Sequence, residues 1–172
     1  MNEQEMQYAI ANKRCLQGQI CIPNVSLYGP EGMYEADLLI ITRTKHVMEI
    51  EIKVSLEDMK RDLKKKIIHN HKMIYMVYYA FPKKLYDEYK EQINELVPSF
   101  AGIMIIKEDN FENIIIRRSL KRKVRPISFT KQIELMKLAA MKWCTGHRWT
   151  CRQKEKGVNN CKLVNINTIG RL

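Results

Sequence analysis

An alternating pattern of apolar and polar residues stands out at positions 48–55, MEIEIKVS. Even positions from Met48 to Val54 are apolar and odd positions are polar, and this period of two predicts a β-strand with one buried face. The run at 35–44 is rich in Ile and Leu, which predicts a buried strand just before it. Because the connection between the two runs is short, we expect them to form an antiparallel hairpin.

The remaining patterns predict helices and further strands. Apolar periodicity and helix-start signals predict helices over 3–17, 55–69, 82–96 and 128–146. Runs rich in β-prone residues predict strands around 25–28, 73–81, 101–109 and 113–119. The sequence beyond Gly146 is polar, basic and irregular. The order α-β-β-β-α-β-α-β-β-α predicts an α/β fold in which helices flank a central mixed sheet, with residues 1–127 as the main domain and 128–172 as a basic helix and tail of the same compact unit.

Composition narrows the class of protein. A chain of 172 residues with 45% apolar content is expected to form one domain. No apolar run approaches the roughly 20 residues needed to span a bilayer, and no apolar leader is present, so we expect no membrane partner. Five cysteines, an odd number, argue against a disulfide framework and favour the cytoplasm of a bacterial or phage-infected host cell.

Positive charge is concentrated near the C-terminus. The net charge is +11, and 15 of the 30 lysines and arginines but only 2 of the 19 acids follow Glu112. This asymmetry predicts contact with a polyanion such as DNA, although a solvated basic surface is the alternative. We expect the basic segment 117–125 and the helix over 55–69 to supply the phosphate contacts, through Lys64, Lys65, Arg117, Arg118, Lys121, Arg122, Lys123 and Arg125.

Carboxylates meet a lysine on the predicted hairpin. Asp37 lies at the entry to the first strand, and the hairpin is expected to bring it near Glu51 and Lys53 on the second. Clustered carboxylates repel one another unless a cation joins them, and Mg²⁺ prefers such oxygen ligands. A neighbouring lysine stabilises charge on a phosphate or orients a water molecule. The pattern predicts metal-assisted phosphodiester hydrolysis, with ion pairs on a solvated strand face as the alternative.

The same residues carry a family resemblance over roughly residues 20–120. EAD at 35–37 and EIK at 51–53 resemble the two motifs of the PD-(D/E)xK nuclease superfamily, with Ala36 in place of the usual proline. The Ser-x-x-Asp at 55–58, the basic helix, the strand that ends before Pro82 and the AGI at 101–103 follow in the order typical of the small phage-type and MmcB-like branch. The resemblance implies a restriction-endonuclease-like α-β-β-β-α-β core.

The resemblance also implies roles for individual residues. Asp37 and Glu51 would ligate Mg²⁺ or Mn²⁺ with the backbone carbonyl of Ile52, and Lys53 would position the attacking water. Many members add a Glu from the first helix, for which Glu3 is the best candidate. Glu35 and Glu49 are further acids that could ligate a second metal ion, but we favour a place at the rim of the site for both.

These roles imply a metal-dependent DNA nuclease in DNA repair, recombination or phage DNA processing. The alternative is a non-catalytic nucleic-acid-binding protein that retains the nuclease fold. Many small nucleases dimerise, so a homodimer stays open.

A second metal site is a weaker hypothesis. The C-terminal residues include a C-x2-H-x3-C-x9-C series that could hold a structural Zn²⁺: Cys144, His147, Cys151 and Cys161. This is not a common zinc-finger spacing, and Cys144 lies on a predicted helix. We therefore favour the interpretation without zinc.

Overall fold

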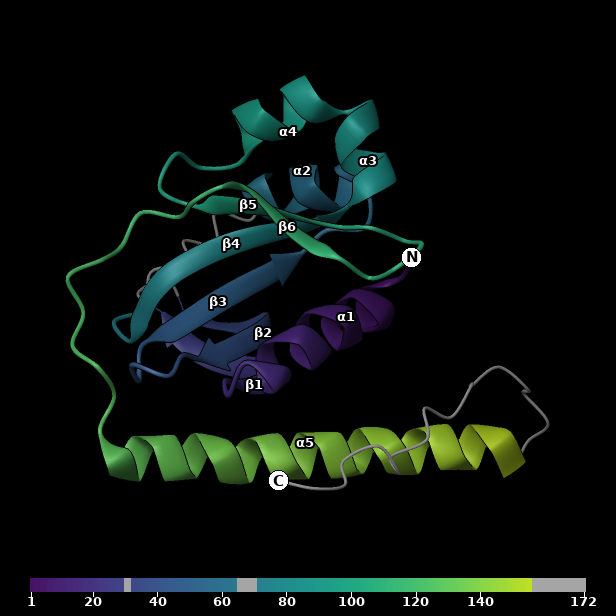
Figure 1. The fold of residues 1–172 in the computed structure, drawn as a ribbon. Coiled ribbons are helices and arrows are strands. Elements are labelled where there is room, and N and C mark those ends of the chain that lie inside the picture. The colour runs from purple at the N-terminus through teal and green to yellow at the C-terminus, as the bar shows by residue number, and fades with distance from the viewer. Residues whose placement is uncertain (30–31, 65–70, 156–172) are drawn as a thin grey trace.

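The computed structural model describes residues 1–29, 32–64 and 71–155, and the side chains within these ranges apart from residues 28–29, 32, 63–64 and 143–155. A six-stranded mixed sheet with helices against both faces forms the fold (Figure 1). The predicted α/β class is therefore confirmed. The helices are α1 (Glu3–Leu16), α2 (Leu56–Lys64), α3 (Lys83–Glu88), α4 (Lys90–Leu96) and α5 (Phe129–Glu155).

The six strands lie in the sheet in the order in which they occur in the chain. They are β1 (Ile20–Gly29), β2 (Gly32–Ile41), β3 (Val47–Ile52), β4 (Ile74–Pro82), β5 (Gly102–Ile106) and β6 (Asn113–Arg117). β1, β2 and β3 pair antiparallel, β3, β4 and β5 pair parallel, and β6 returns antiparallel to β5. The predicted hairpin of 35–44 with 48–55 is the β2–β3 pair.

Two apolar clusters lie on opposite faces of this sheet. On one face, Met6 and Ile10 of α1 pack against Ile50 and Ile52 of β3. On the other, residues from α2, α3, α4 and α5 share a single cluster with the strands, including Met59, Tyr86, Ile93 and Leu135. All six residues of β3 are buried, so its alternation of Glu and Ile does not mark a solvated face. The polar residues of this strand lie beneath helices.

Side-chain caps begin the two helices nearest the hairpin. Asn2 accepts a hydrogen bond from the backbone N–H of Glu5 at 2.9 Å, and the Glu5 carboxylate accepts one from the N–H of Asn2 at 2.9 Å, which makes a capping box for α1. Ser55 caps α2, since its hydroxyl accepts from the N–H of Asp58 at 3.1 Å. The predicted Ser-x-x-Asp start of this helix is thus observed.

Several boundaries differ from those predicted. β1 has ten residues where a short strand around 25–28 was expected, because its turn-forming residues, Pro23 and Asn24, are carried within a strand paired to β2. The helix predicted over 82–96 divides into α3 and α4 at Tyr89, whose ψ of 28° leaves the helical region. α5 continues to Glu155 instead of ending near Gly146, so the segment expected to be irregular is helical that far. None of the helices in the described part of the chain is long and apolar enough to cross a membrane.

Candidate functional site

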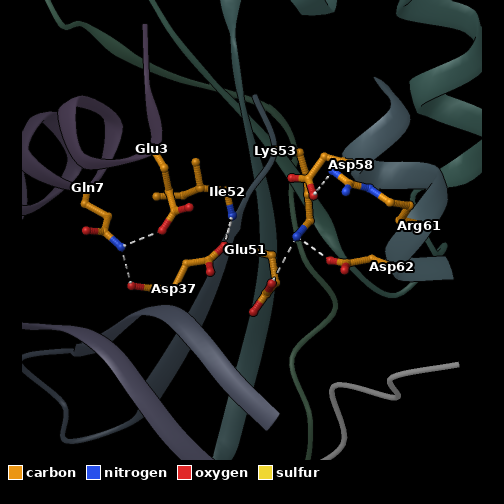
Figure 2. Close-up of polar contacts among 9 residues, drawn as sticks. All are labelled: Glu3, Gln7, Asp37, Glu51, Ile52, Lys53, Asp58, Arg61 and Asp62. Atoms are coloured by element: carbon orange, nitrogen blue, oxygen red, sulfur yellow. Dashed lines mark hydrogen bonds and ion pairs between the residues drawn. The ribbon is translucent and has the colours of Figure 1, made fainter. Parts of the chain in front are cut away.

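Asp37 joins β2 to β3 where their backbone pairing stops. The last backbone pair on this side is Leu38 with Ile50. One residue further on, the Asp37 carboxylate accepts a hydrogen bond of 2.6 Å from the backbone N–H of Ile52 (Figure 2). Asn24 of β1 lies opposite Asp37 and has a left-handed backbone with φ of 51°. The β1–β2 pairing continues beyond this point, whereas the β2–β3 pairing does not.

Lys53 follows directly after β3 and lies between two carboxylates. Its Nζ is 3.4 Å from Oε2 of Glu51 and forms a second ion pair with Asp62 of α2 (Figure 2). Glu51 and Lys53 are 3% and 5% exposed, which removes most of the solvent screening that weakens surface ion pairs. The predicted triad of Asp37, Glu51 and Lys53 is therefore brought together, and Asp62 joins it.

Glu3 of α1 approaches the site from the opposite side of Asp37, and Gln7 holds it there. The Gln7 side chain is 6% exposed. Its Nε2 donates to Glu3 Oε1 at 3.2 Å and to the backbone carbonyl of Asp37 at 3.0 Å (Figure 2). The same nitrogen is 2.7 Å from Asn24 Oδ1. Gln7 therefore ties α1, β1 and β2 to one another at the carboxylates.

The two remaining acids of the predicted set lie in different environments. Glu35 is exposed. Glu49 was placed at the rim, and that placement is wrong: the residue is fully buried and accepts a hydrogen bond of 3.3 Å from the hydroxyl of Tyr34. It lies on the same side of β3 as Glu51, beneath the helices that cover that face. An alternating strand pattern does not reveal whether a second layer covers the polar side.

Burial and mutual repulsion disfavour ionisation of the acids. Desolvation raises the pKa of Asp37 to about 6, although the N–H of Ile52 and the charge of Lys53 oppose the shift. Desolvation, followed by the charge of Asp37, raises the pKa of Glu51 well above its usual range. The pKa of Lys53 is raised, because Glu51 and Asp62 outweigh the burial that lowers it. The site therefore favours a bound cation and keeps its lysine charged.

The chemistry of this donor set fits a hard divalent cation. Mg²⁺ is usually bound by one or two carboxylates together with water and phosphate oxygens. Asp37 and Glu51 are two such carboxylates on adjacent strands, and the charge of Asp37 helps to raise the pKa of Glu51. Within the described residues no group of three or more His, Cys, Asp or Glu side chains is arranged to hold a metal ion. A cation here would thus take two protein carboxylates, with water or phosphate oxygens as its other ligands.

The basic residues predicted to contact DNA fall into two groups. Arg118, Lys121, Lys123 and Arg125 are exposed, as a phosphate contact requires. Arg122 is partly buried with its guanidinium 5.3 Å from the centre of the Phe100 ring. The side chain of Lys64, and Lys65 altogether, lie outside the described part of the chain.

Arg117 has a structural role that the sequence interpretation did not anticipate. Its Nη2 donates to the carbonyls of Val97 and Pro98, each at 3.0 Å, and its Nε donates to that of Ala101 at 3.1 Å. These carbonyls follow the end of α4, so Arg117 satisfies backbone acceptors beyond a helix C-terminus. Two of the three guanidinium nitrogens therefore serve the fold, and the DNA contact of Arg117 stays a prediction.

The side chains of the suggested zinc site lie outside the described part of the chain. Cys144, His147 and Cys151 lie on the backbone of α5, but their side chains fall outside the described residues, as does the whole of Cys161.

Asp62 and Gln7 were missed, although each had a signal in the sequence. Asp62 is three residues after Met59, an inward residue of α2, so it belongs to the flank that meets the sheet. Gln7 is one helical turn after Glu3, the residue already selected on α1. In both cases the helical period places the residue next to one that the sequence analysis had already selected as inward-facing or as a candidate ligand. The sequence did not show which residue outside the helix it would contact.

Comparisons with known proteins bear on the fold alone. No protein-family model and no curated protein matches the chain. Among solved structures, the chain is similar to SPO1766, a protein of unknown function from Silicibacter pomeroyi, with 15% sequence identity and a TM-score of 0.59. The match covers 94% of this chain and 98% of that one. The similarity therefore extends over almost the full length of both proteins.

Proposed function

We propose that this protein is a metal-dependent DNA nuclease that hydrolyses phosphodiester bonds. We further propose that α1 to β4 form the α-β-β-β-α-β core of the PD-(D/E)xK nucleases. One observation carries the proposal: Asp37, Glu51 and Lys53, from two adjacent strands, gather in a buried cluster where the β2–β3 ladder ends. Four exposed cations on the segment after β6 supply a surface for a phosphate backbone.

Each residue would have a distinct role. Asp37 and Glu51, with the Ile52 carbonyl, would hold Mg²⁺ or Mn²⁺. When bound, such a cation lowers the pKa of a water ligand and withdraws charge from a phosphoryl oxygen. The hydrogen bond from the Ile52 N–H fixes one oxygen of Asp37, and Gln7 fixes the backbone of the same residue. Both hydrogen bonds limit the freedom of the carboxylate before substrate arrives.

Lys53 would act as a cation and not as a general base. Its ion pairs with Glu51 and Asp62 keep it protonated at neutral pH, since both raise its pKa. A charged ammonium next to the two carboxylates can orient a water molecule and stabilise negative charge that develops on the phosphate. Asp62 would be a positioning residue, because it acts through Lys53.

A cleavage assay tests the proposal. The purified protein is incubated with supercoiled, linear and single-stranded DNA in the presence of Mg²⁺, Mn²⁺ or EDTA. We expect cleavage that requires the metal and that falls by at least about a hundredfold in Asp37→Asn, Glu51→Gln and Lys53→Met. Matched exposed controls, Asp109→Asn, Glu95→Gln and Lys84→Met, should retain the full rate. Thermal melting confirms that each variant is folded.

Two results would contradict the proposal in different ways. DNA binding without cleavage under every metal condition would leave a non-catalytic DNA-binding protein. Metal-dependent cleavage that survives all three site substitutions would place the reaction elsewhere or with a contaminant. Calorimetric titration with Mn²⁺ is an independent measure, and Asp37→Asn should weaken Mn²⁺ binding even if no DNA substrate is found.

A further inference from the structure

Two cysteines meet at the other end of α1, away from the candidate nuclease site. Cys15 lies in the last turn of α1 and is exposed, whereas Cys21 lies in β1 and is 2% exposed. The Sγ of Cys21 is 3.9 Å from the carbonyl oxygen of Ala11. The buried sulfur therefore lies directly against the C-terminal half of the helix.

The register of the helix brings the second sulfur to the same place. In an α-helix the carbonyl of residue 11 accepts from the N–H of residue 15, and side chains four apart lie on one face. A sulfur in contact with the Ala11 carbonyl is consequently beside the Cys15 side chain. Cys15 also raises the pKa of the Cys21 thiol, as expected for a thiol placed beside it.

The turn between the cysteines makes this approach possible. Gly18 has a left-handed backbone with φ of 71°, and its N–H donates to the carbonyl of Cys15 at 2.9 Å. The Gln17 and Gln19 N–H groups both donate to the carbonyl of Arg14, at 3.0 and 3.1 Å. These bonds fold residues 17–19 tightly and return the chain alongside the helix that it has just left.

We propose that Cys15 and Cys21 are an oxidation site, at which a peroxide converts the two thiols to a reversible disulfide. The proposal does not depend on nuclease activity. In the first step the Cys15 thiolate attacks one peroxide oxygen, the O–O bond breaks, and the departing hydroxide takes up a proton to leave as water. In the second step the sulfur of Cys21 attacks the resulting sulfenic acid, an S–S bond forms, and a second water leaves. Two thiols are oxidised and one peroxide is reduced.

The environment assigns different roles to the two sulfur atoms. Cys15 is exposed and therefore meets the oxidant first. Burial, and then the neighbouring Cys15, raises the pKa of the Cys21 thiol. Cys21 therefore does not react with peroxide directly and suits the resolving step, in which it attacks oxidised Cys15. The guanidinium of Arg14 acts in the opposite direction on Cys21. Arg14 Nε is buried without a hydrogen-bond partner in the described part of the chain, so it can stabilise negative charge on the Cys21 sulfur when that sulfur attacks.

Peptide mapping of the whole protein tests this directly. No lysine or arginine lies between Arg14 and Arg43, so trypsin releases residues 15–43 as one peptide that contains both cysteines and no other. After mild peroxide treatment and alkylation, we expect most of this peptide to lose the mass of two hydrogen atoms and to carry no alkyl group. Dithiothreitol should restore two alkylatable thiols. Oxidation of Met33 in the same peptide adds an oxygen and is distinguished by its mass.

Two variants separate the roles of the cysteines. Cys21→Ser should leave Cys15 as a sulfenic acid that dimedone traps, and Cys15→Ser should leave Cys21 unmodified until the protein is unfolded. The proposal is overturned if wild-type Cys15 accumulates sulfinic acid while Cys21 stays reduced. It is equally overturned if Cys15 is found linked to a peptide that contains Cys144, Cys151 or Cys161.

Discussion

Asp37 shows how one residue can connect backbone structure with ionisation. Its carboxylate replaces a missing backbone partner for Ile52, its carbonyl receives Gln7, and its charge acts on Glu51. The sequence identified this residue because the predicted hairpin would bring it near Glu51 and Lys53. It did not reveal the hydrogen bond to Ile52, because that interaction depends on where the β2–β3 ladder stops.

Asp37→Asn should change how the stability depends on pH. The folded protein holds a proton on Asp37 up to a pKa of about 6, against an ordinary value of 3.8. Between these values the folded state binds more protons than the unfolded state, so the free energy of unfolding falls as pH rises. We expect Asp37 to contribute a loss of about 1–3 kcal/mol between pH 4 and pH 8, and Asp37→Asn should remove this part while Glu51, whose pKa is also raised, continues to contribute a loss of the same sign. Urea unfolding at several pH values measures it.

The control for this prediction is Asp109→Asn, an exposed acid, which should follow the wild-type curve. The raised pKa of Asp37 would be contradicted if the free energy of unfolding of the wild-type protein rose with pH over this interval. It would also be contradicted if this free energy had the same slope against pH in Asp37→Asn as in the wild type. Mg²⁺ at pH 8 should raise the stability of the wild-type protein but not that of Asp37→Asn.

Substitution of Arg117 should lower the stability of the protein but not its DNA affinity, and substitution of its exposed basic neighbours should do the reverse. Arg117→Ala removes the donor to the carbonyls of Val97 and Ala101, whereas that of Pro98 still accepts from the backbone N–H of Ala101, so we expect a loss of about 1–3 kcal/mol in unfolding free energy with little change in DNA affinity. Replacing the four exposed cations by Gln should leave stability unchanged and reduce the salt dependence of DNA binding, by up to about 0.9 in log–log slope for each phosphate that is no longer neutralised. The residues replaced are Arg118, Lys121, Lys123 and Arg125.

Urea unfolding and fluorescence anisotropy with a labelled duplex at several salt concentrations measure the two quantities. Arg117→Lys keeps the charge but not the fork of donors, so it should recover only part of the stability. A large loss of DNA affinity in Arg117→Lys would place this residue on the binding surface.

At the scale of the elements, the sequence predicted most of the fold. Period-two and apolar runs located the strands, and Ser55 located the start of α2. Strand order could not be read, since it depends on pairing between segments far apart in the chain. One predicted helix is divided into two at Tyr89, and no Gly or Pro occurs there from which the break could have been predicted. The length of β1 was missed, because its turn-forming residues are tolerated within the strand.

Gly102 is a point of close approach among three strands. A Cβ at this position would overlap the Tyr78 ring of β4 and lie 2.8 Å from the carbonyl oxygen of Arg117 in β6. Because that oxygen is backbone and Tyr78 is buried, neither can move easily, and Gly102→Ala should lower the free energy of unfolding by about 1–3 kcal/mol or more. Urea unfolding tests this.

Gly18→Ala is a useful comparison for that measurement. Its added Cβ meets nothing within 4 Å, so its cost should be confined to the left-handed backbone, about 1–2 kcal/mol. Equal losses in the two variants, or a smaller loss in Gly102→Ala, would show that the strands adjust without penalty.

For the molecule as a whole, α5 is the element that joins the C-terminal region to the main sheet. Leu135 and Ala139 belong to the same apolar cluster as residues of β1 and α2, and Lys142 Nζ donates to the carbonyl of Asn24 at 2.7 Å. In Figure 1 the helix runs beside β1, far from β6, the strand that precedes it in the chain. The sequence predicted this helix but not which edge of the sheet it covers.

Leu135→Ala should release α5 from the sheet. The buried side chain loses its packing, for which we expect a cost of about 2–4 kcal/mol and faster proteolysis within α5. Met136→Ala is the matched control, since Met136 is the next residue and is 46% exposed, and its cost should stay below about 0.5 kcal/mol. Limited proteolysis followed by mass spectrometry identifies the cleavage sites. Equal protection of α5 in both variants would indicate that Leu135 does not anchor it.

The bond between Lys142 and Asn24 also affects how the protein forms on the ribosome. The two residues are 118 positions apart, and synthesis at roughly 5–20 residues per second separates their appearance by on the order of ten seconds. During that interval β1 and β2 can pair, but the apolar surface that awaits α5 stays uncovered. The packing of the β1 side of the sheet is therefore completed only after α5 has been synthesised.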